Sequence, residues 1–195
     1  EFYERELEDC RQAGVLFSTY DFREGEETLL LPLPLYHIYA FNACLGMLAR
    51  GGHTVLVPNP RDLKSLVAAF RDSGCTGFAG LNTLFVALCN DADFSRLKVT
   101  MSGGMALTMA AARRWQEVTG VEIVEGYGMS ETSPVISVNP VNANRLGTIG
   151  IAVPSTEVRI VDDNGNEVAA GEPGELVVRG PQVMLGYWNQ PGETA

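Results

Sequence analysis

Short apolar runs alternate with amphipathic stretches through most of the chain. Between residues 62 and 70, for example, apolar side chains recur at i, i+3, i+4 and i+7, which places them on one face of a helix. Strands that alternate with helices predict βαβ units, and therefore an α/β fold with a mainly parallel sheet and helices on its faces. The predicted strands are Leu29–Leu33, Thr54–Val57, Thr76–Ala79, Lys98–Ser102 and Val121–Val124, and the predicted helices are Phe41–Arg50, Arg61–Asp72, Thr83–Asn90 and Thr108–Thr119.

The pattern changes after about Arg145, where three further strand-like runs follow one another without a helix. They are Gly147–Val153, Thr156–Val161 and Gly174–Arg179, and the sequence Asn164-Gly165 between the last two is typical of a hairpin turn. We expect residues 1–145 to form an α/β subdomain and residues 146–195 to form part of a small antiparallel β subdomain. These strands are too few for a closed barrel or sandwich, so we expect the chain to be an internal piece of a longer protein.

The charge and the cysteines exclude several classes of protein. The net charge is -10 and no cluster of Lys and Arg is present, which argues against nucleic acid as a partner. No apolar run reaches the ~20 residues that a membrane helix needs. The four cysteines show neither the spacing of a zinc site nor a disulfide framework, so we expect free thiols in a reducing cytosol. They are Cys10, Cys44, Cys75 and Cys89.

Three predicted strand ends carry residues suited to binding a ligand. Pro34–His37 follow the first strand, Ser102–Met105 end the fourth and Glu125–Thr132 end the fifth. The carboxyl ends of parallel strands meet at one edge of a sheet, so these segments are expected to line one crevice.

The segment after the fifth strand carries the most chemistry. Two glycines around Tyr127 allow the backbone to approach a flat ligand, and the Tyr127 ring can pack beside it. The Ser130 hydroxyl suits a phosphate oxygen or a metal-bound oxygen. The Glu131 carboxylate suits Mg²⁺, which binds through one or two carboxylates plus substrate phosphates. The alternative is a glycine-rich turn with a solvated glutamate.

The other two strand ends are open to two interpretations each. His37 can gate a cavity or contact a carboxylate, or it can be a histidine that is hydrogen-bonded within a packed strand end. Gly103 and Gly104 can border a ligand or form a tight turn between strand and helix. The chain contains no Gly-x-x-x-x-Gly-Lys-Ser/Thr loop, no Gly-x-Gly-x-x-Gly after a strand and no Gly-x-Ser-x-Gly turn, so the common nucleotide folds and the serine hydrolases gain no support.

Four motifs occur along the chain in the order Leu33-Pro34-Leu35-Tyr36-His37, Ser102-Gly103-Gly104-Met105, Glu125-Gly126-Tyr127-Gly128-Met129-Ser130-Glu131 and Gly180-Pro181-Gln182-Val183-Met184-Leu185-Gly186-Tyr187-Trp188. Together they resemble the motifs of the adenylate-forming superfamily, and most closely those of bacterial long-chain fatty acid–CoA ligases. The stretches Asn59–Asp62 and Val153–Asp163 strengthen the closer similarity, which covers the chain from Leu29 to Ala195.

The resemblance implies a two-step reaction. The family activates a carboxylate with Mg²⁺ and ATP to an acyl-adenylate plus pyrophosphate, and the thiol of CoA then displaces AMP. The resemblance assigns catalytic roles to His37 near the acyl carboxylate, Ser130 at the phosphate and Glu131 as the Mg²⁺ ligand. Ser130 stands where the family usually has Thr and keeps the hydroxyl. The residues expected to bind ATP or to border the acyl group and adenine are Gly103, Gly104, Glu125, Gly126, Tyr127, Gly128, Met129 and Ser130.

The resemblance also implies parts that this chain lacks. A glycine- and Ser/Thr-rich phosphate loop is expected before His37, a Thr-Gly-Asp segment after Ala195, and then a C-terminal domain with a catalytic Lys. A triphosphate with about four negative charges must be met by cations. The motif around Glu131 supplies no basic residue. We therefore expect the chain alone to be inactive.

Two alternatives remain open on the sequence. The first is an adenylation domain for another carboxylic acid, such as an aryl-CoA ligase or a peptide-synthetase domain. The second is a non-catalytic module that binds acyl groups or nucleotides. For the long-chain ligase, the expected partners are a fatty acid, ATP and CoA in the cytoplasm. The acyl chain length, contact with the inner face of the membrane and a homodimer are left open.

Overall fold

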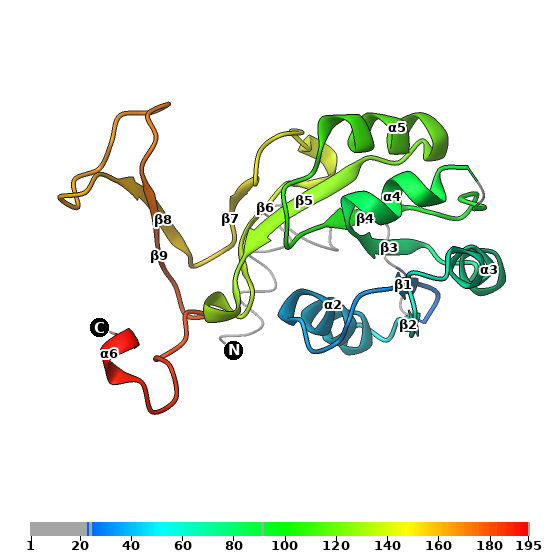
Figure 1. Ribbon diagram of the computed structural model, residues 1–195, viewed down its shortest axis with the longest axis horizontal. Helices are drawn as coiled ribbons and strands as arrows, with labels where there is room; N and C mark the ends of the chain where they lie inside the picture. The colour runs from blue at the N-terminus through cyan, green and yellow to red at the C-terminus, as the bar shows by residue number, and fades with distance from the viewer. Residues whose placement is uncertain (1–22, 24, 91, 195) are drawn as a thin grey trace.

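A seven-stranded sheet forms the body of the molecule (Figure 1). The computed structural model describes residues 23, 25–90 and 92–194 of the 195-residue chain. The strand order is β2-β1-β3-β4-β5-β6-β7, and the first five of these strands run parallel. This confirms the predicted α/β fold. The strands are β1 (Thr28–Leu31), β2 (His53–Leu56), β3 (Gly77–Gly80), β4 (Val99–Ser102), β5 (Ile123–Gly128), β6 (Val135–Val138) and β7 (Ile151–Ala152).

Two antiparallel strands extend the parallel sheet beyond β5. β6 pairs with β5, and β7 pairs with β6. The sequence pattern does not predict β6. Its four residues directly follow Pro134, whereas the predicted strands of the parallel sheet are separated from one another by helices. The strand expected at Gly147–Val153 is shortened to Ile151–Ala152 and joins the large sheet. The subdomain boundary expected after residue 145 stays a prediction.

The helices begin and end at residues suited to those positions. Asp62 caps α3, where its Oδ1 accepts a hydrogen bond from the Ser65 backbone N–H at 3.3 Å. Gly74 and Gly120 follow α3 and α5 with φ of 56° and 72°, the left-handed conformation that glycine adopts without strain. The four predicted helices are all present. They are α2 (Ile38–Ala49), α3 (Leu63–Ser73), α4 (Asn82–Leu88) and α5 (Met109–Thr119).

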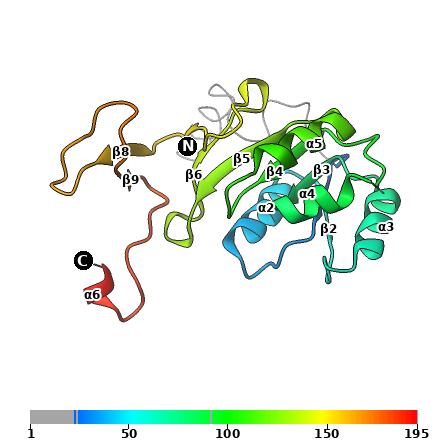
Figure 2. The same cartoon turned by 45° about the horizontal axis from the view of Figure 1, so that its top comes forward.

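The helices lie on opposite faces of the sheet and bury alternate residues of β1. Leu29 and Leu31 contact the side of α2, whereas Leu30 belongs to the cluster formed with α3, α4 and α5. α4 lies between α3 and α5 on that second face (Figures 1 and 2). Successive side chains of a strand point to opposite faces, so a strand covered on both sides is apolar throughout.

An aromatic cluster around Trp115 fills the core beneath α3, α4 and α5. The Trp115 ring lies 4.9 Å from Phe94 and 5.1 Å from Phe85 between ring centroids, both edge to face. Its indole N–H donates to Thr100 Oγ1 at 3.1 Å. The fully buried ring therefore leaves no unsatisfied polar group.

A second, two-stranded sheet projects from the end of the large sheet that carries β7 (Figure 1). It pairs β8 (Glu157–Val161) with β9 (Glu175–Arg179) antiparallel, as predicted. Asp162 Oδ1 accepts from the backbone N–H groups of Asn164 and Asn166 at 2.9 Å in the hairpin that follows β8. The remaining elements are the short helix α6 (Pro191–Thr194) and the 3-10 turns η1 (Ser130–Thr132) and η2 (Val141–Ala143).

Two further expectations concern the membrane and the cysteines. Within the described ranges, no helix combines the length and the apolar character needed to span a bilayer. Cys44, Cys75 and Cys89 are free thiols, and burial raises the pKa of Cys75 to about 11. Cys10 lies outside the described residues.

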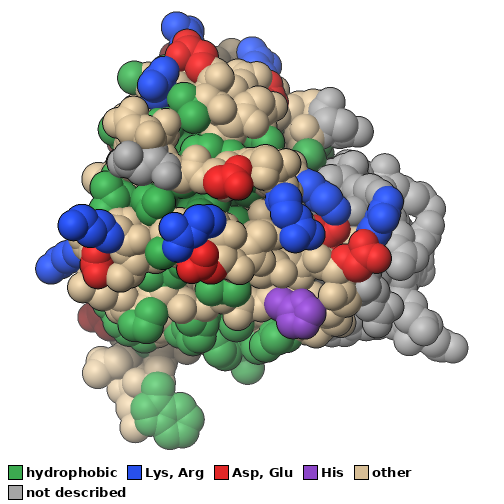
Figure 3. Space-filling model, turned by 90° about the vertical axis from the view of Figure 1, so that its right-hand side faces the viewer, with side chains coloured by type: hydrophobic (Ala, Val, Ile, Leu, Met, Phe, Trp, Pro, Cys, Tyr) green, Lys and Arg blue, Asp and Glu red, His purple; other side chains and the backbone are tan. Residues whose placement is uncertain are grey.

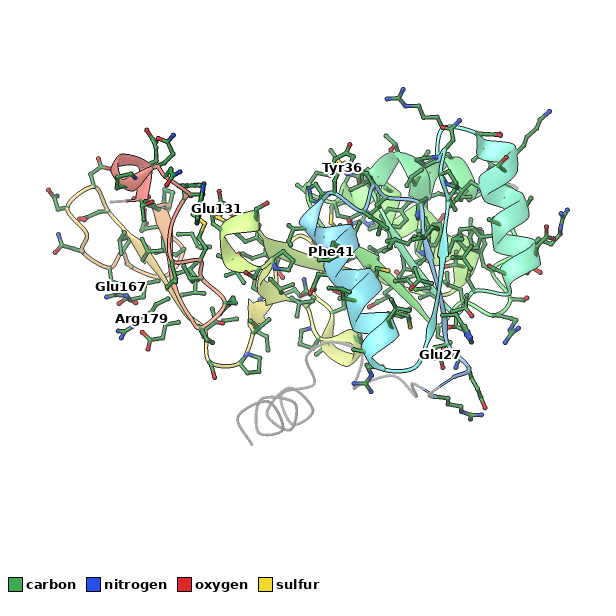
Figure 4. All side chains as sticks on the ribbon, turned by 90° about the horizontal axis from the view of Figure 1, so that it is seen from below. Glu27, Tyr36, Phe41, Glu131, Glu167 and Arg179 are labelled. Carbon is green, nitrogen blue, oxygen red and sulfur yellow. The ribbon has the colours of Figure 1, made fainter. Side chains whose placement is uncertain are left out.

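A buried carboxylate is paired with a lysine at the amino-terminal ends of β1 and β4, opposite the carboxyl ends that line the cavity. Glu27, labelled in Figure 4, has a fully buried side chain whose Oε1 lies 2.6 Å from Lys98 Nζ. Burial acts to raise the pKa of Glu27, but hydrogen bonds from Lys98 and Thr76 act with further contacts to lower it below its ordinary value. The charged pair therefore stabilises the fold at pH values above about 4.3, which is the pKa of a glutamate in the unfolded chain. This contribution is lost as the pH falls through the lower pKa that Glu27 has in the folded protein.

Replacement of Lys98 by methionine is expected to destabilise the fold by about 2 kcal/mol at pH 7, because Glu27 is left buried without its cation. This value is below that of a fully buried pair because the Lys98 side chain is 39% exposed. The loss is expected to shrink as the pH falls through the lowered folded-state pKa of Glu27. The free energy of unfolding of the parent protein and of the Lys98→Met variant is measured by urea denaturation at a series of pH values from 7 downward.

The matched control is Arg71→Met, which removes the ion pair with Asp72 on α3. Both side chains of that pair are about two-thirds exposed. The face around α3 carries interleaved basic and acidic side chains in contact with solvent (Figure 3). The control is therefore expected to change the free energy of unfolding by less than about 0.5 kcal/mol. Equal losses in the two variants would contradict the role given to the buried pair.

Candidate active site

A cavity of about 350 Å³ lies at the carboxyl ends of β4 and β5, beside the first turns of α2. It brings together residues from the three strand ends that the sequence singled out. The predicted residues that line it are His37, Gly103, Gly104, Gly126, Tyr127, Gly128, Met129, Ser130 and Glu131.

His37 lies at the N-terminus of α2 and faces the cavity. Its Nδ1 accepts a hydrogen bond from the Tyr39 backbone N–H at 3.2 Å, so the imidazole caps the helix. A Cβ on Gly104 would lie 3.7 Å from His37 Cε1, which makes these two residues neighbours across the cavity. His37 is thus hydrogen-bonded, but as an exposed helix cap and not within a packed strand end. Its expected role in gating the cavity or contacting a carboxylate stays a prediction. An imidazole that accepts at Nδ1 carries its proton at Nε2 when neutral.

The loop after β4 is held in place from outside the cavity. Gly104 adopts a φ of 81°, and the chain then runs to α5. Asn82 donates to Ala106 O at 2.7 Å and accepts from the Thr108 N–H at 2.9 Å. Glu125 Oε1 accepts from the Leu107 N–H at 2.8 Å. These bonds fix the path of the loop that carries both glycines.

Glu125 is buried and does not line the cavity. Its side chain turns towards the loop before α5, and its carbonyl oxygen accepts from Asn139 at 3.2 Å. Glu125 thus positions a cavity wall, whereas its expected role in binding ATP stays a prediction.

The two glycines around Tyr127 differ in what surrounds them. A Cβ on Gly128 would lie 1.7 Å from Pro134 O, because the chain folds back on itself at the start of β6. A Cβ on Gly126 would meet its nearest atom at an ordinary 3.5 Å. At Gly128 the close approach is therefore made by the protein's own backbone. The Tyr127 ring, 37% exposed, is left facing the cavity.

Ser130 and Glu131 lie in the 3-10 turn η1 at the edge of the cavity. Buried Thr132 anchors this turn by donating from Oγ1 to Pro134 O at 2.7 Å. Glu131 Oε1 accepts from the Tyr187 phenol at 2.5 Å. That hydrogen bond lowers the pKa of Glu131, so the carboxylate is ionised at neutral pH. Figure 4 shows Glu131 at the end of the large sheet that faces β8 and β9.

The charges around the cavity restrict the metal that it can hold. Glu131 is the acidic residue in its lining, and none of the described lining residues is Lys or Arg. Across the described part of the chain, no three His, Cys, Asp or Glu side chains gather into a metal cluster. A metal at Glu131 would therefore find few other ligands among the described residues of this chain. This fits Mg²⁺, which is commonly bound by one carboxylate together with phosphate oxygens.

A family model described as "AMP-binding enzyme" matches residues 7–188. The chain belongs to the AMP-binding enzyme family. The resemblance found in the ordered motifs is thereby confirmed.

Relatives of the chain include proteins that carry the name long-chain-fatty-acid–CoA ligase. The one from Salmonella typhimurium is 47% identical over 177 residues, which cover 87% of this chain and 32% of the relative. The one from Bacillus subtilis is 38% identical over 184 residues, which cover 90% of this chain and 33% of the relative. The chain thus spans about a third of the length of these curated relatives.

A solved member of the family has the same fold. The anthranilate CoA ligase AuaEII, in complex with anthranoyl-AMP, matches with a TM-score of 0.84 at 27% identity. The match covers 95% of this chain and 38% of that protein. Both the parallel sheet and its antiparallel extension therefore belong to the arrangement found in AMP-binding enzymes.

Sequence reasoning missed several residues that line the cavity. Tyr39, in the first turn of α2, donates from its phenol to Met101 O at 3.1 Å, and burial raises its pKa. Val135 and Val138 of β6 complete the apolar wall. The one available signal was the position of Tyr39, two residues after His37 at the start of a helix. The valines could not be found without knowing that β6 pairs with β5.

Proposed function

We propose that this chain forms part of an AMP-forming ligase that joins a long-chain fatty acid to CoA. The observation that carries the proposal is the cavity itself, because it gathers every predicted site residue except Glu125. The 47% identity to a long-chain-fatty-acid–CoA ligase supports the choice of acid.

The first step in this proposal is attack of a fatty acid carboxylate oxygen on the α-phosphorus of ATP, with pyrophosphate as the leaving group. Tyr127 packs against the adenine, and Gly126 allows the ring to approach the backbone. The Ser130 hydroxyl donates to the α-phosphate. His37 holds the carboxylate by donating from Nε2. Phosphoryl transfer depends mainly on such positioning and on electrostatic stabilisation.

Mg²⁺, when bound, neutralises charge on the phosphates. Glu131 would hold it, because Glu131 is the carboxylate at the edge of the cavity.

In the second step the CoA sulfur attacks the acyl carbon and AMP leaves. In this proposal the carbonyl carbon lies near His37 and Gly104, which are neighbours in the cavity lining.

The proposal assigns the remaining positive charge to parts of the protein outside this chain. The cavity lining includes no Lys or Arg among the described residues, whereas ATP carries about four negative charges. The chain by itself is therefore proposed to be inactive.

The test uses a ligase chimera, in which this chain replaces the matching segment of the Salmonella typhimurium relative. AMP release is measured with ATP, Mg²⁺, CoA and a long-chain fatty acid, for the chimera and for this chain alone. The expected result is AMP from the chimera only. Turnover by the chain alone would contradict the need for outside cations. A folded chimera that forms no AMP with any acid would favour a non-catalytic binding module.

A second candidate is the activation of an aromatic acid. It is favoured by the similarity to the anthranilate CoA ligase and by a cavity of only about 350 Å³. The same assay with anthranilate and benzoate separates the two. Faster AMP release with these acids than with palmitate would favour the aromatic substrate.

A further inference from the structure

The segment that follows β9 contacts the turn at the edge of the cavity that carries Glu131. We call Gly180–Tyr187 the strap. The Met184 backbone N–H donates to Glu131 O at 2.8 Å. Gln182 Nε2 donates to Val135 O at 3.2 Å and to Thr156 Oγ1 at 2.7 Å. The strap is therefore tied both to η1 and β6 and to the segment that leads into β8.

The strap ends in the phenol that contacts the Glu131 carboxylate. The distance from Tyr187 Oη to Glu131 Oε1 is 2.5 Å. Tyr187 is itself held, because its backbone N–H donates to Thr194 Oγ1 at 3.0 Å. Glu131 lies at the rim of the cavity in partial contact with solvent. A glutamate in such a place loses side-chain entropy when it is fixed in one rotamer, so a partner is needed to hold it.

The chemical nature of this partner matters for a cation site. A lysine or arginine in the place of Tyr187 would hold the carboxylate but would also offset its charge. A phenol donates one hydrogen bond and leaves the negative charge intact. It occupies one lone pair of Oε1, and a carboxylate offers about four acceptor positions. The arrangement thus orients the carboxylate without weakening its attraction for a cation.

We propose that Tyr187 is a positioning residue that fixes the Glu131 carboxylate for the divalent cation that accompanies ATP. This inference rests on the proposed function, because it takes Glu131 as the metal ligand. Groups that orient a metal ligand from behind commonly change metal affinity or activity by about 10- to 100-fold when removed. The strap thereby makes residues more than fifty positions away in sequence part of the metal site.

The test is Tyr187→Phe in the ligase chimera, with Mg²⁺ as the varied component. The concentration of Mg²⁺ at half-maximal AMP release is expected to rise about 10-fold, while the rate at saturating Mg²⁺ falls by less. A second readout is independent of turnover. Binding of Mn²⁺ in the presence of a non-hydrolysable ATP analogue, followed by electron paramagnetic resonance, is expected to weaken by a similar factor.

Tyr36→Phe is the matched control, because it removes a phenol that is 93% exposed and lies outside the cavity lining. It should leave Mg²⁺ dependence and Mn²⁺ binding unchanged. Neither variant should move the melting temperature by more than about 2 °C, since both lost hydroxyls are at the surface.

The outcomes separate the two proposals. An active chimera whose Mg²⁺ dependence and Mn²⁺ binding are unaltered by Tyr187→Phe overturns the role of Tyr187 alone. A drop in melting temperature with unaltered metal dependence also overturns it, because Tyr187 is then only structural. A folded parent chimera without Mg²⁺-dependent AMP release overturns the proposed function, and this inference with it.

Discussion

Replacement of Glu131 by glutamine is expected to lower AMP release by the ligase chimera about 100-fold at saturating Mg²⁺. The amide keeps the length of the side chain and an oxygen that accepts from Tyr187, so the contact with the strap is preserved. What is lost is the negative charge that attracts the cation. Because the cavity lining holds no other Asp or Glu among the described residues, no neighbour can replace that charge.

The measurement is a Mg²⁺ titration of AMP release, together with the melting temperature of each protein. Glu117→Gln is a suitable control, since Glu117 lies exposed on α5 and pairs only loosely with Arg114 at 3.8 Å. The control should retain the parent rate. A Glu131→Gln chimera within fivefold of the parent at every Mg²⁺ concentration would mean that the cation is held elsewhere.

Replacement of Gly128 by alanine is expected to destabilise the fold by about 3 kcal/mol, near the upper end for overpacking. The new methyl group would lie 1.7 Å from Pro134 O, and a backbone atom cannot rotate away as a side chain can. β6 must therefore separate from β5 at this point, which opens the wall of the cavity. Urea unfolding of the chain itself measures the loss.

Gly126→Ala supplies the comparison for the same strand. Its methyl group would meet Ser137 O at 3.5 Å, an ordinary contact. The expected loss is below about 1 kcal/mol. Similar losses at the two positions would show that glycine is required along this strand for a reason other than the approach of Pro134.

The parallel part of the fold could be predicted because its signals are local. Each of the five strands contains apolar or β-branched residues, and Asp62, Gly74 and Gly120 mark helix ends through their own backbone and side-chain chemistry. β6 carries no such signal. It becomes a strand because the chain turns back at Pro134 and pairs with β5, which is a tertiary interaction.

The residues of the candidate site also fall into two groups, those that local sequence signals place and those that only tertiary contacts place. Residues that follow strands, such as His37 and Gly103, could be placed together because parallel strands end at one edge of a sheet. Glu125 lies in the same motif, yet its side chain turns to the Leu107 N–H. The contact between Tyr187 and Glu131 joins two distant motifs, and no spacing in the sequence indicates it.

The buried pair of Glu27 and Lys98 bears on which strand alignment the chain selects. β1 presents leucine to both faces of the sheet, so a slip of one residue would exchange Leu29 and Leu30 with little change in apolar burial. Alternation of apolar and polar residues, which usually penalises such slips, is absent from this strand. A slipped β1 would carry Glu27 away from Lys98 and leave a charge buried alone. We therefore expect the ion pair to discriminate between near-equivalent strand pairings, in addition to its contribution to net stability.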